Sequence, residues 1–164
     1  MAIGNAIKAP AWLSVEHGTI YREERESIQA SKASLADACR PITKDYLVAE
    51  MKFGFWTSLL NARYDRLWHK IIGDVFPNMP RSKRTRGDAS VLMNGVRKLR
   101  NAALHHHSIW HWNDLTERHA EIRNIIGYMC NSNSEIAVHV DRFPQIHSVG
   151  LGDCQKMVAK IMAR

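Results

Sequence analysis

Cysteine is scarce in this sequence, and the few cysteines form no recognisable pattern. Cys39, Cys130 and Cys154 are odd in number, widely spaced and outside any C-x-x-C pair. This spacing excludes a disulfide framework and a zinc ribbon as the basis of the fold. We expect three buried, reduced thiols.

Long hydrophobic runs are also missing. No stretch approaches the roughly 20 unbroken apolar residues that a membrane helix needs, and the N-terminal text "MAIGNAIKAPAWLSVEHG" lacks a basic segment followed by an apolar one. We therefore expect a cytoplasmic protein with no membrane partner. Its 164 residues, 45% of them hydrophobic and 24% charged, fit one globular domain over residues 1–164.

Several catalytic motifs are absent as well. The sequence has no G-x-S-x-G nucleophile elbow, and neither G-x-G-x-x-G nor G-x-x-x-x-G-K-[ST] occurs in it. These absences argue against a serine hydrolase and against an enzyme that cradles nucleotide phosphates in a glycine-rich loop. We expect no cofactor.

Positive charge is concentrated in the middle of the chain. Lys and Arg outnumber Asp and Glu by 23 to 16, a net charge of +7. Residues 51–112 hold 11 of the basic residues and 3 of the acidic ones. A localised basic surface attracts polyanions, which makes RNA an expected partner, although charge alone fits a solvated basic face equally well.

The pattern of apolar residues predicts helices almost throughout. The expected elements are an exposed or partner-facing helix over 20–38, a long core helix from Thr43 to about Phe76 with a bend at Gly54, a basic loop over 77–88, a helix over 89–107, a helix that starts after Asn113 or Asp114 and stops at "NSNS", and a last amphipathic helix over about 153–162. No run of strands is visible. The sequence therefore predicts an all-α bundle of four or five helices.

The segment "KLRNAALHHHSIWHW", residues 98–112, has three interpretations: a metal site, a catalytic site for RNA, or an accident of surface composition. His107 and His111 have the i, i+4 spacing of metal ligands on a helix, and His119 is a candidate third ligand. However, the helix is expected to end near Ser108, and no acidic residue is spaced as in H-E-x-x-H. We expect no native metal.

Arg100, Asn101 and His105 carry the catalytic interpretation. Cleaving RNA without a metal requires a base for the ribose 2′-hydroxyl, a cation for the phosphorane, and an acid for the leaving 5′-oxygen. Histidine titrates near neutral pH, and arginine is a permanent, forked phosphate ligand. On an ideal helix five residues span about 140°. The pair therefore shares a site only if the arginine folds over or the helix unwinds before the histidine.

Longer segments around this motif also follow a known pattern. The texts "VAEMKFGFWTSLLNARYDRLW", "VFP", "LMNGVRKLRNAALHHHSIW" and "DLTERHAEIRNIIGYMC" occur in this order within residues 45–130. Their order and spacing resemble those of Abi-like proteins of the HEPN ribonuclease superfamily, which are associated with abortive phage infection and toxin–antitoxin defence. The resemblance implies an all-α HEPN fold, usually a homodimer in which two copies of an R-x4–6-H motif meet in a cleft.

The resemblance also implies roles for the matched residues. Arg100 falls on the motif arginine, Asn101 on the polar residue beside it and His105 on the motif histidine. The implied roles are phosphate binding and charge stabilisation by the arginine, acid–base catalysis by the histidine, and orientation of the site by the asparagine. The expected products are a 2′,3′-cyclic phosphate and a 5′-hydroxyl.

Three departures from the family pattern lie close to the motif. Ala102 stands where the family usually has arginine, Leu104 where it has alanine, and His107-Ser108 where it has Glu-Pro. The loss of Glu-Pro removes an acid and a rigid helix stop. This change affects the expected local geometry and substrate preference. It affects the expected catalytic roles less, because the three matched polar residues are intact.

Further residues are expected to contact RNA. They are His106, His107, Arg97 and Lys98 near the motif, and Arg81, Lys83, Arg84 and Arg86 in the basic loop. The four loop residues could equally guide an acidic antitoxin or remain solvated. Phe53, Phe55 and Trp56 fit core or dimer packing better than base stacking. For Trp110 and Trp112, a role in roofing the cleft and a role in core packing stay open.

Two functional hypotheses follow. The first is a metal-independent HEPN endoribonuclease that acts as a toxin or phage-defence effector, with an antitoxin protein as a further partner. The second is a non-catalytic HEPN module that binds RNA or a protein, in which the resemblance reports fold alone.

Overall fold

A computed structural model of the chain describes residues 20–150 and 152–163. Within these residues it contains helices and no strand, which confirms the expected all-α class. No helix in this part of the chain combines the length and apolar character needed to cross a bilayer. The α-helices are α2 (Arg22–Asp37), α3 (Lys44–Glu50), α4 (Phe53–Ser58), α5 (Asp65–Val75), α6 (Arg86–Leu104), α7 (Leu115–Met129), α8 (Asn131–Val140), α9 (Phe143–Val149) and α10 (Gly152–Met162), with 3-10 helices η1 (Ala62–Tyr64) and η2 (Arg81–Lys83).

The first described helix, α2, packs on the body of the protein. Ile28 and Leu35 are buried at 0% and 1% exposure, so the expectation of an exposed helix is wrong for this face. Glu24 lies on the same stripe and is 1% exposed. The helix ends at Asp37, ahead of Pro41, and the chain turns through Cys39 at φ +52°.

The expected long helix over 43–76 is wrong, because the chain divides it into α3, α4, η1 and α5. Thr43 does cap α3, since its Oγ1 accepts a 3.4 Å hydrogen bond from the Tyr46 N–H. The break comes at Met51 and Lys52, whose ψ angles of 130° and 150° are extended. It lies ahead of Gly54, where we expected only a bend.

These breaks allow more apolar side chains to reach the core than one helix face can present. The adjacent residues Leu59 and Leu60 are each 2% exposed, and Tyr64 is 3% exposed. On one continuous helix Met51 and Leu60 would lie about 180° apart, because successive residues turn by about 100°, yet these side chains are only 6% and 2% exposed. The Trp68 Nε1–H donates a 2.6 Å hydrogen bond to the Leu59 carbonyl, which satisfies an acceptor where α4 ends.

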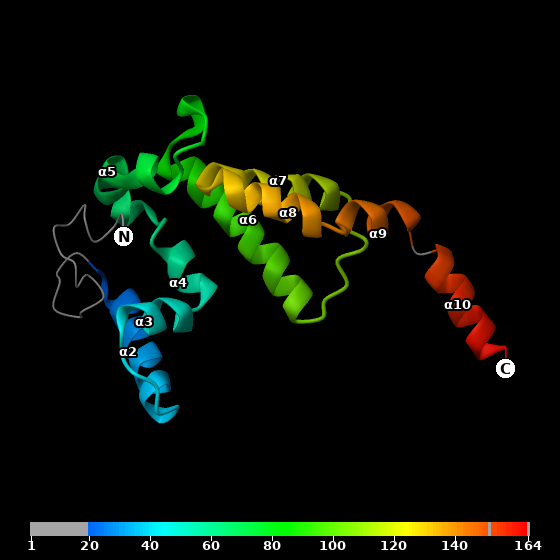
Figure 1. Cartoon of the computed structure of the whole chain (residues 1–164), viewed down its shortest axis with the longest axis horizontal. Coiled ribbons are helices and arrows are strands. Elements are labelled where there is room, and N and C mark those ends of the chain that lie inside the picture. The colour runs from blue at the N-terminus through cyan, green and yellow to red at the C-terminus, as the bar shows by residue number, and fades with distance from the viewer. Residues whose placement is uncertain (1–19, 151, 164) are drawn as a thin grey trace.

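The hydrophobic core lies among α2–α5 and the start of α6 (Figure 1). Its buried members are Ile20, Ile28, Leu35, Leu47, Met51, Phe55, Leu59, Leu60, Tyr64, Leu67, Trp68, Ile71, Phe76, Met79 and Ala89. Phe53 and Trp56 are partly buried, and the Trp56 ring meets the Phe55 ring edge-on with centroids 5.1 Å apart. The aromatic segment thus belongs to the packing of α4.

Helix α6 carries the candidate motif out of this core. Thr85 is its N-cap, because Thr85 Oγ1 accepts a 3.1 Å hydrogen bond from the Asp88 N–H. The helix runs for 19 residues and ends at Leu104. Its first turn lies beside α5 and its last turn projects from the body (Figure 1).

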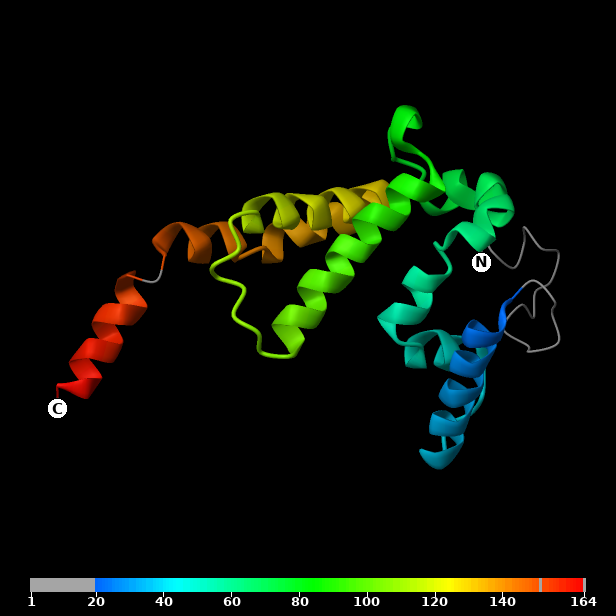
Figure 2. The same ribbon diagram turned by 180° about the vertical axis from the view of Figure 1, so that it is seen from behind.

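Helices α7 and α8 lie side by side and run in opposite directions (Figures 1 and 2). The chain is extended at Cys130, with φ −161° and ψ 122°, between the two helices. Helix α7 ends at Met129, immediately before "NSNS", as expected, and residues 131–134 form the first turn of a further helix, α8. Short polar side chains favour helix starts as much as turns, so the segment "NSNS" is compatible with a turn and with the start of a helix. The described helical segments therefore exceed the expected four or five.

The cysteines only partly fit the expectation of buried thiols. Cys39 is exposed and Cys130 is half-buried, and both are free. The expectation is wrong for Cys39, which lies in the turn after α2. The side chain of Cys154 lies outside the described residues.

Candidate functional site

Arg100 and Asn101 lie in the last turn of α6. The exposed Arg100 guanidinium donates a 3.2 Å hydrogen bond from Nη1 to Asn101 Oδ1. Asn101 is half-buried, and its carbonyl accepts a 2.9 Å hydrogen bond from the His105 N–H. Nearby Ala102 is 9% exposed and faces inward. The Arg100 guanidinium is therefore exposed to solvent, and its hydrogen bond to the Asn101 side chain holds it beside the helix.

The three consecutive histidines form the end of this helix. His105 is the C-cap residue, and His106 has a left-handed backbone with φ +56°. The His106 N–H donates to Ala103 O at 3.2 Å, and the His107 N–H donates to Ala102 O at 2.9 Å. This pair of hydrogen bonds is the Schellman motif, in which glycine usually occupies the left-handed position. A histidine there costs about 1–2 kcal/mol of backbone strain.

All three imidazoles are exposed at this helix end. The His105 and His107 rings have centroids 6.3 Å apart and planes tilted by 41°. The carbonyl end of a helix carries partial negative charge, which favours a cation beside it. The turn therefore groups three solvent-exposed imidazole rings at the carbonyl end of α6.

The motif pair itself is close in sequence but not bonded in one chain. The backbone of His105, at φ −90° and ψ 16°, still nearly continues the helix. The helix does not unwind before His105, and the turn comes one residue later. In the described residues the Arg100 guanidinium forms no ion pair, and its hydrogen bond goes to Asn101 rather than to His105.

The two tryptophans after the histidines brace the loop that leads into α7. The Arg118 guanidinium lies 5.0 Å from the centre of the Trp112 ring. The Trp110 ring lies against His147 of α9, with centroids 5.4 Å apart. Both tryptophans are half-buried. These contacts favour packing against α7 and α9 over the cleft-roofing alternative.

A polar cluster around Asp141, which the sequence did not single out, holds the far side of this loop. The Asp141 carboxylate is 10% exposed. It accepts hydrogen bonds from His119 Nε2 at 3.0 Å, Arg123 Nη1 at 2.8 Å and the Phe143 N–H at 3.1 Å. Burial raises the pKa of Asp141, but the donors from Arg123, Phe143 and His119 outweigh it and hold this pKa below its usual value.

The same cluster includes a stack of rings. The Phe143 ring lies between His119 and His147, with centroid distances of 4.3 Å and 4.8 Å. Since His147 also contacts Trp110, the stack connects α7, α9 and the loop after the histidines. The sequence feature that could have predicted this contact is the text "DRFP", residues 141–144. An aspartate two residues before the start of a helix commonly accepts a hydrogen bond from the first N–H of that helix.

The basic loop splits into two pairs of side chains. Arg84 donates to Met79 O at 2.9 Å and 2.6 Å and to Pro77 O at 2.8 Å. Arg86 donates to Asp65 and to the Leu60 carbonyl. Arg81 and Lys83 are instead exposed on η2. Two of the four expected RNA contacts therefore also brace the fold.

The basic loop and the motif lie at opposite ends of α6 (Figure 1). Nineteen helical residues at about 1.5 Å each span about 28 Å. Lys98 is exposed and lies closer to the motif, and Arg97 Nε donates to Asn94 Oδ1 at 3.2 Å. Only a polyanion longer than one nucleotide could contact both regions of one chain.

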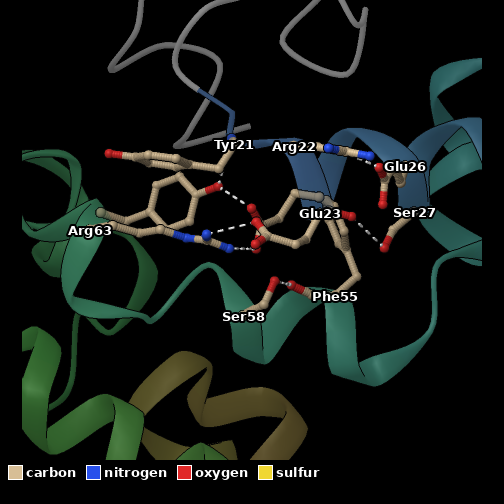
Figure 3. Close-up of polar contacts among 10 residues, drawn as sticks. Tyr21, Arg22, Glu23, Glu26, Ser27, Phe55, Ser58 and Arg63 are labelled. Atoms are coloured by element: carbon tan, nitrogen blue, oxygen red, sulfur yellow. Dashed lines mark hydrogen bonds and ion pairs between the residues drawn. The ribbon is translucent and has the colours of Figure 1, made fainter.

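A second buried polar cluster lies at the start of α2 (Figure 3), and Figure 1 shows α2 at the opposite end of the molecule from α10. The Glu24 carboxylate, 1% exposed, accepts a 2.6 Å hydrogen bond from the Tyr64 hydroxyl and pairs with Arg63 Nη2. The Tyr21 N–H donates to the Tyr64 oxygen at 3.2 Å, and Arg63 Nη1 pairs with Glu23 at 2.7 Å. Burial and the Glu24 carboxylate raise the Tyr64 pKa well above its ordinary value.

This cluster connects α2 to η1 and is fully partnered, which is the expected condition of a structural buried carboxylate. Burial raises the Glu24 pKa, but hydrogen bonds from Tyr64, Ser58 and Arg63 lower it by more. The Glu24 pKa therefore lies below its usual value. The sequence carried a signal for it. Glu24 shares the buried stripe of α2 with Ile28 and Leu35, and an acid on an apolar stripe needs partners.

The described residues bring no group of three or more potential metal ligands together. No protein-family model matches the chain, and neither a curated protein nor a solved structure matches it. The roles expected for Arg100, Asn101 and His105 therefore remain predictions, supported by the motif and by the geometry at the end of α6.

Proposed function

We propose that this protein is a metal-independent HEPN endoribonuclease that acts as a toxin or phage-defence effector. The observation that carries the proposal is the hydrogen bond between Arg100 Nη1 and Asn101 Oδ1, one turn before the exposed His105. Its substrate is RNA, and its expected partners are a second copy of the chain and an antitoxin protein.

The chemistry divides among a few groups. His105 accepts the proton of a ribose 2′-hydroxyl, and the 2′-oxygen attacks the adjacent phosphorus. Arg100 neutralises charge on the phosphorane through its fork of N–H donors. The bond to the 5′-oxygen then breaks, and an imidazolium returns a proton to it. The products are a 2′,3′-cyclic phosphate and a 5′-hydroxyl, so no metal, oxidant or water is consumed.

One chain supplies an open site rather than an enclosed one. Neither Arg100 nor His105 lines the apolar groove between α3–α7 or the polar hollow between α6 and α7. Both side chains are exposed. A second copy would add another Arg100 and another His105, which provides the acid opposite the base and excludes water from the phosphate.

A cleavage assay in EDTA tests the proposal. Full-length protein is incubated with a mixed-sequence RNA, alongside Arg100→Ala, Asn101→Ala and His105→Ala. We expect loss of the arginine or the histidine to slow cleavage by about 10²-fold or more, with a smaller effect for the asparagine. A substrate with 2′-deoxyribose at the cleaved position should resist cleavage.

Matched variants control for charge and fold. Arg66→Ala removes an equally exposed arginine from α5, and His69→Ala removes a histidine that is 74% exposed on the same helix. Both should cleave like wild type. Wild-type protein that leaves RNA intact, or Arg100→Ala and His105→Ala variants that cleave normally, would contradict the proposal.

A non-catalytic RNA-binding or protein-interaction module is the second candidate. The absence of a hydrogen bond between Arg100 and His105 in the described residues favours it. It predicts that RNA binds and is recovered uncut, with binding weakened by loss of Arg100 and unaffected by His105→Ala. Cleavage that depends on both residues would exclude it.

A further inference from the structure

A large apolar groove lies open on the body of the protein. Its volume of about 580 Å³ is about four times that of a cavity of roughly 150 Å³ that accommodates benzene. The groove opens to solvent where Val48 and Met129 are 39% and 47% exposed. Its lining side chains come from α3–α7 and are Lys44, Val48, Phe53, Trp56, Leu59, Leu60, Trp68, Val75, Phe76, Met93, Val96, Ile122, Ile125, Ile126 and Met129.

The C-terminal arm, defined here as α9 and α10, carries apolar side chains that are exposed to solvent. None of its described side chains is buried. Ile146 and Val149 of α9 are 55% and 60% exposed, and Val158, Ile161 and Met162 of α10 are 57%, 64% and 83% exposed. The last three are spaced i, i+3 and i+4, so they share one face of α10. Helices of this length are marginal in water without packing.

The arm cannot cover its own groove in the observed arrangement. Figures 1 and 2 show α10 at the opposite end of the molecule from α2–α5. The chain runs away from the groove along α8 and continues through α9. A turn at Gly150, where φ is +70°, separates α9 from α10. Helix α10 therefore lies away from the groove of its own chain.

We propose that the α10 face of one copy docks in the apolar groove of a second copy, with reciprocal exchange of the two arms. The chemistry of both surfaces argues for this occupant. Apart from Lys44, every side chain that lines the groove is aliphatic, aromatic or methionine, so the groove offers too few cations to hold a nucleic acid backbone. Each chain provides one groove and one arm, so exchange around a two-fold axis leaves neither surface exposed.

This inference goes beyond the proposed nuclease, since it names the surfaces that hold two copies together, and it rests only on the dimer within that proposal. Its readout is molar mass, which does not depend on RNA cleavage. A dimer without nuclease activity would support the arm exchange and contradict the enzyme. Cleavage by a monomer would support RNA cleavage, but it would contradict both the arm exchange and a site shared by two copies.

Light scattering after size exclusion tests the exchange with full-length protein. Wild type should elute at twice the chain mass of 18.7 kDa. An arm variant, Ile161→Glu, and a groove variant, Val96→Glu, should each raise the dimer dissociation constant at least tenfold, since either places a charge in the apolar contact. Val91→Glu is the matched control, because Val91 is 74% exposed on the same helix and does not line the groove.

Mixing the two defective variants gives the sharper result. A dimer of one arm variant and one groove variant retains one intact arm and one intact groove that fit each other. We expect the equimolar mixture to recover dimer that neither variant forms alone. If Val96→Glu loses its helical circular dichroism, Val48→Glu at the exposed rim of the groove replaces it.

Three outcomes overturn the proposal. A monomeric wild type would show that the arm folds back on its own chain or serves another partner. Unchanged dimerisation of Ile161→Glu would place the interface elsewhere. Failure of the mixed variants to recover dimer would show that the arm and the groove do not contact each other.

Discussion

The backbone N–H of His107 donates a 2.9 Å hydrogen bond to the carbonyl oxygen of Ala102, and this bond closes the end of α6. It forms only because His106 between them adopts φ +56°. The exposed positions of His105 and His107 therefore depend on one strained residue. Strain of this kind commonly accompanies functional sites.

Replacing His106 with glycine should stabilise the protein. Glycine adopts a left-handed backbone without strain, so His106→Gly should raise the free energy of unfolding by about 1 kcal/mol. His105→Gly is the control, because His105 has φ −90° and gains nothing from glycine. Urea unfolding followed by circular dichroism gives both values. A destabilised His106→Gly would mean that the imidazole makes a contact worth more than the strain.

Asp141→Asn should weaken the connection between α7 and α9 and change its acid response. The Asp141 pKa lies below its unfolded value of about 3.9. Its contribution to stability is therefore present above pH 4, roughly, and is lost as the pH falls through the folded pKa. The variant should be less stable than wild type at pH 7, and the difference should shrink towards pH 3. Urea unfolding at both pH values measures this, and the exposed Asp74→Asn should show no such difference.

The helical class and the start of α7 were accessible from sequence, because each is specified locally. Asp114, one of the two expected caps, occupies the N-cap of α7, whereas α6 begins at Arg86 and ends at Leu104, three residues before each expected limit of 89 and 107. The breaks after α3 and α4 were not accessible in the same way. They allow Met51 and Leu60 to be buried together, although these residues would lie on opposite faces of one helix. Tertiary packing decides this, and helical periodicity does not show it.

The candidate site was likewise predictable from sequence only where local features specify it. Spacing identified Arg100 and His105, but it could not show that the turn would come at His106, since a left-handed backbone is uncommon for any residue other than glycine. Asp141 is 22 residues from His119, and Glu24 is 40 residues from Tyr64. Contacts at such separation are products of the fold. Sequence alone offered two local signals, the text "DRFP" for Asp141 and an acid on an apolar stripe for Glu24.

Tyr64→Phe should destabilise the attachment of α2. It removes the donor to the nearly buried Glu24 and the acceptor for the Tyr21 N–H. We expect a loss of about 1–3 kcal/mol, the range for a hydrogen bond to a charged group. Because the Tyr64 pKa is raised in the folded state, its contribution is present below pH 10, roughly, and lost above it. The variant should lack this alkaline decline in urea unfolding, whereas the exposed Tyr46→Phe should keep it.

Arg84→Ala and Arg81→Ala should separate the structural from the solvent-facing part of the basic loop. Arg84 holds the carbonyls of Met79 and Pro77, so its loss should lower the free energy of unfolding by about 1–2 kcal/mol. Arg81 is exposed, and its loss should change stability by less than about 0.5 kcal/mol. If Arg81 contacts a phosphate of bound RNA, Arg81→Ala should also reduce the salt dependence of RNA affinity by about one counterion. Equal destabilisation by both variants, measured by urea unfolding, would contradict this division.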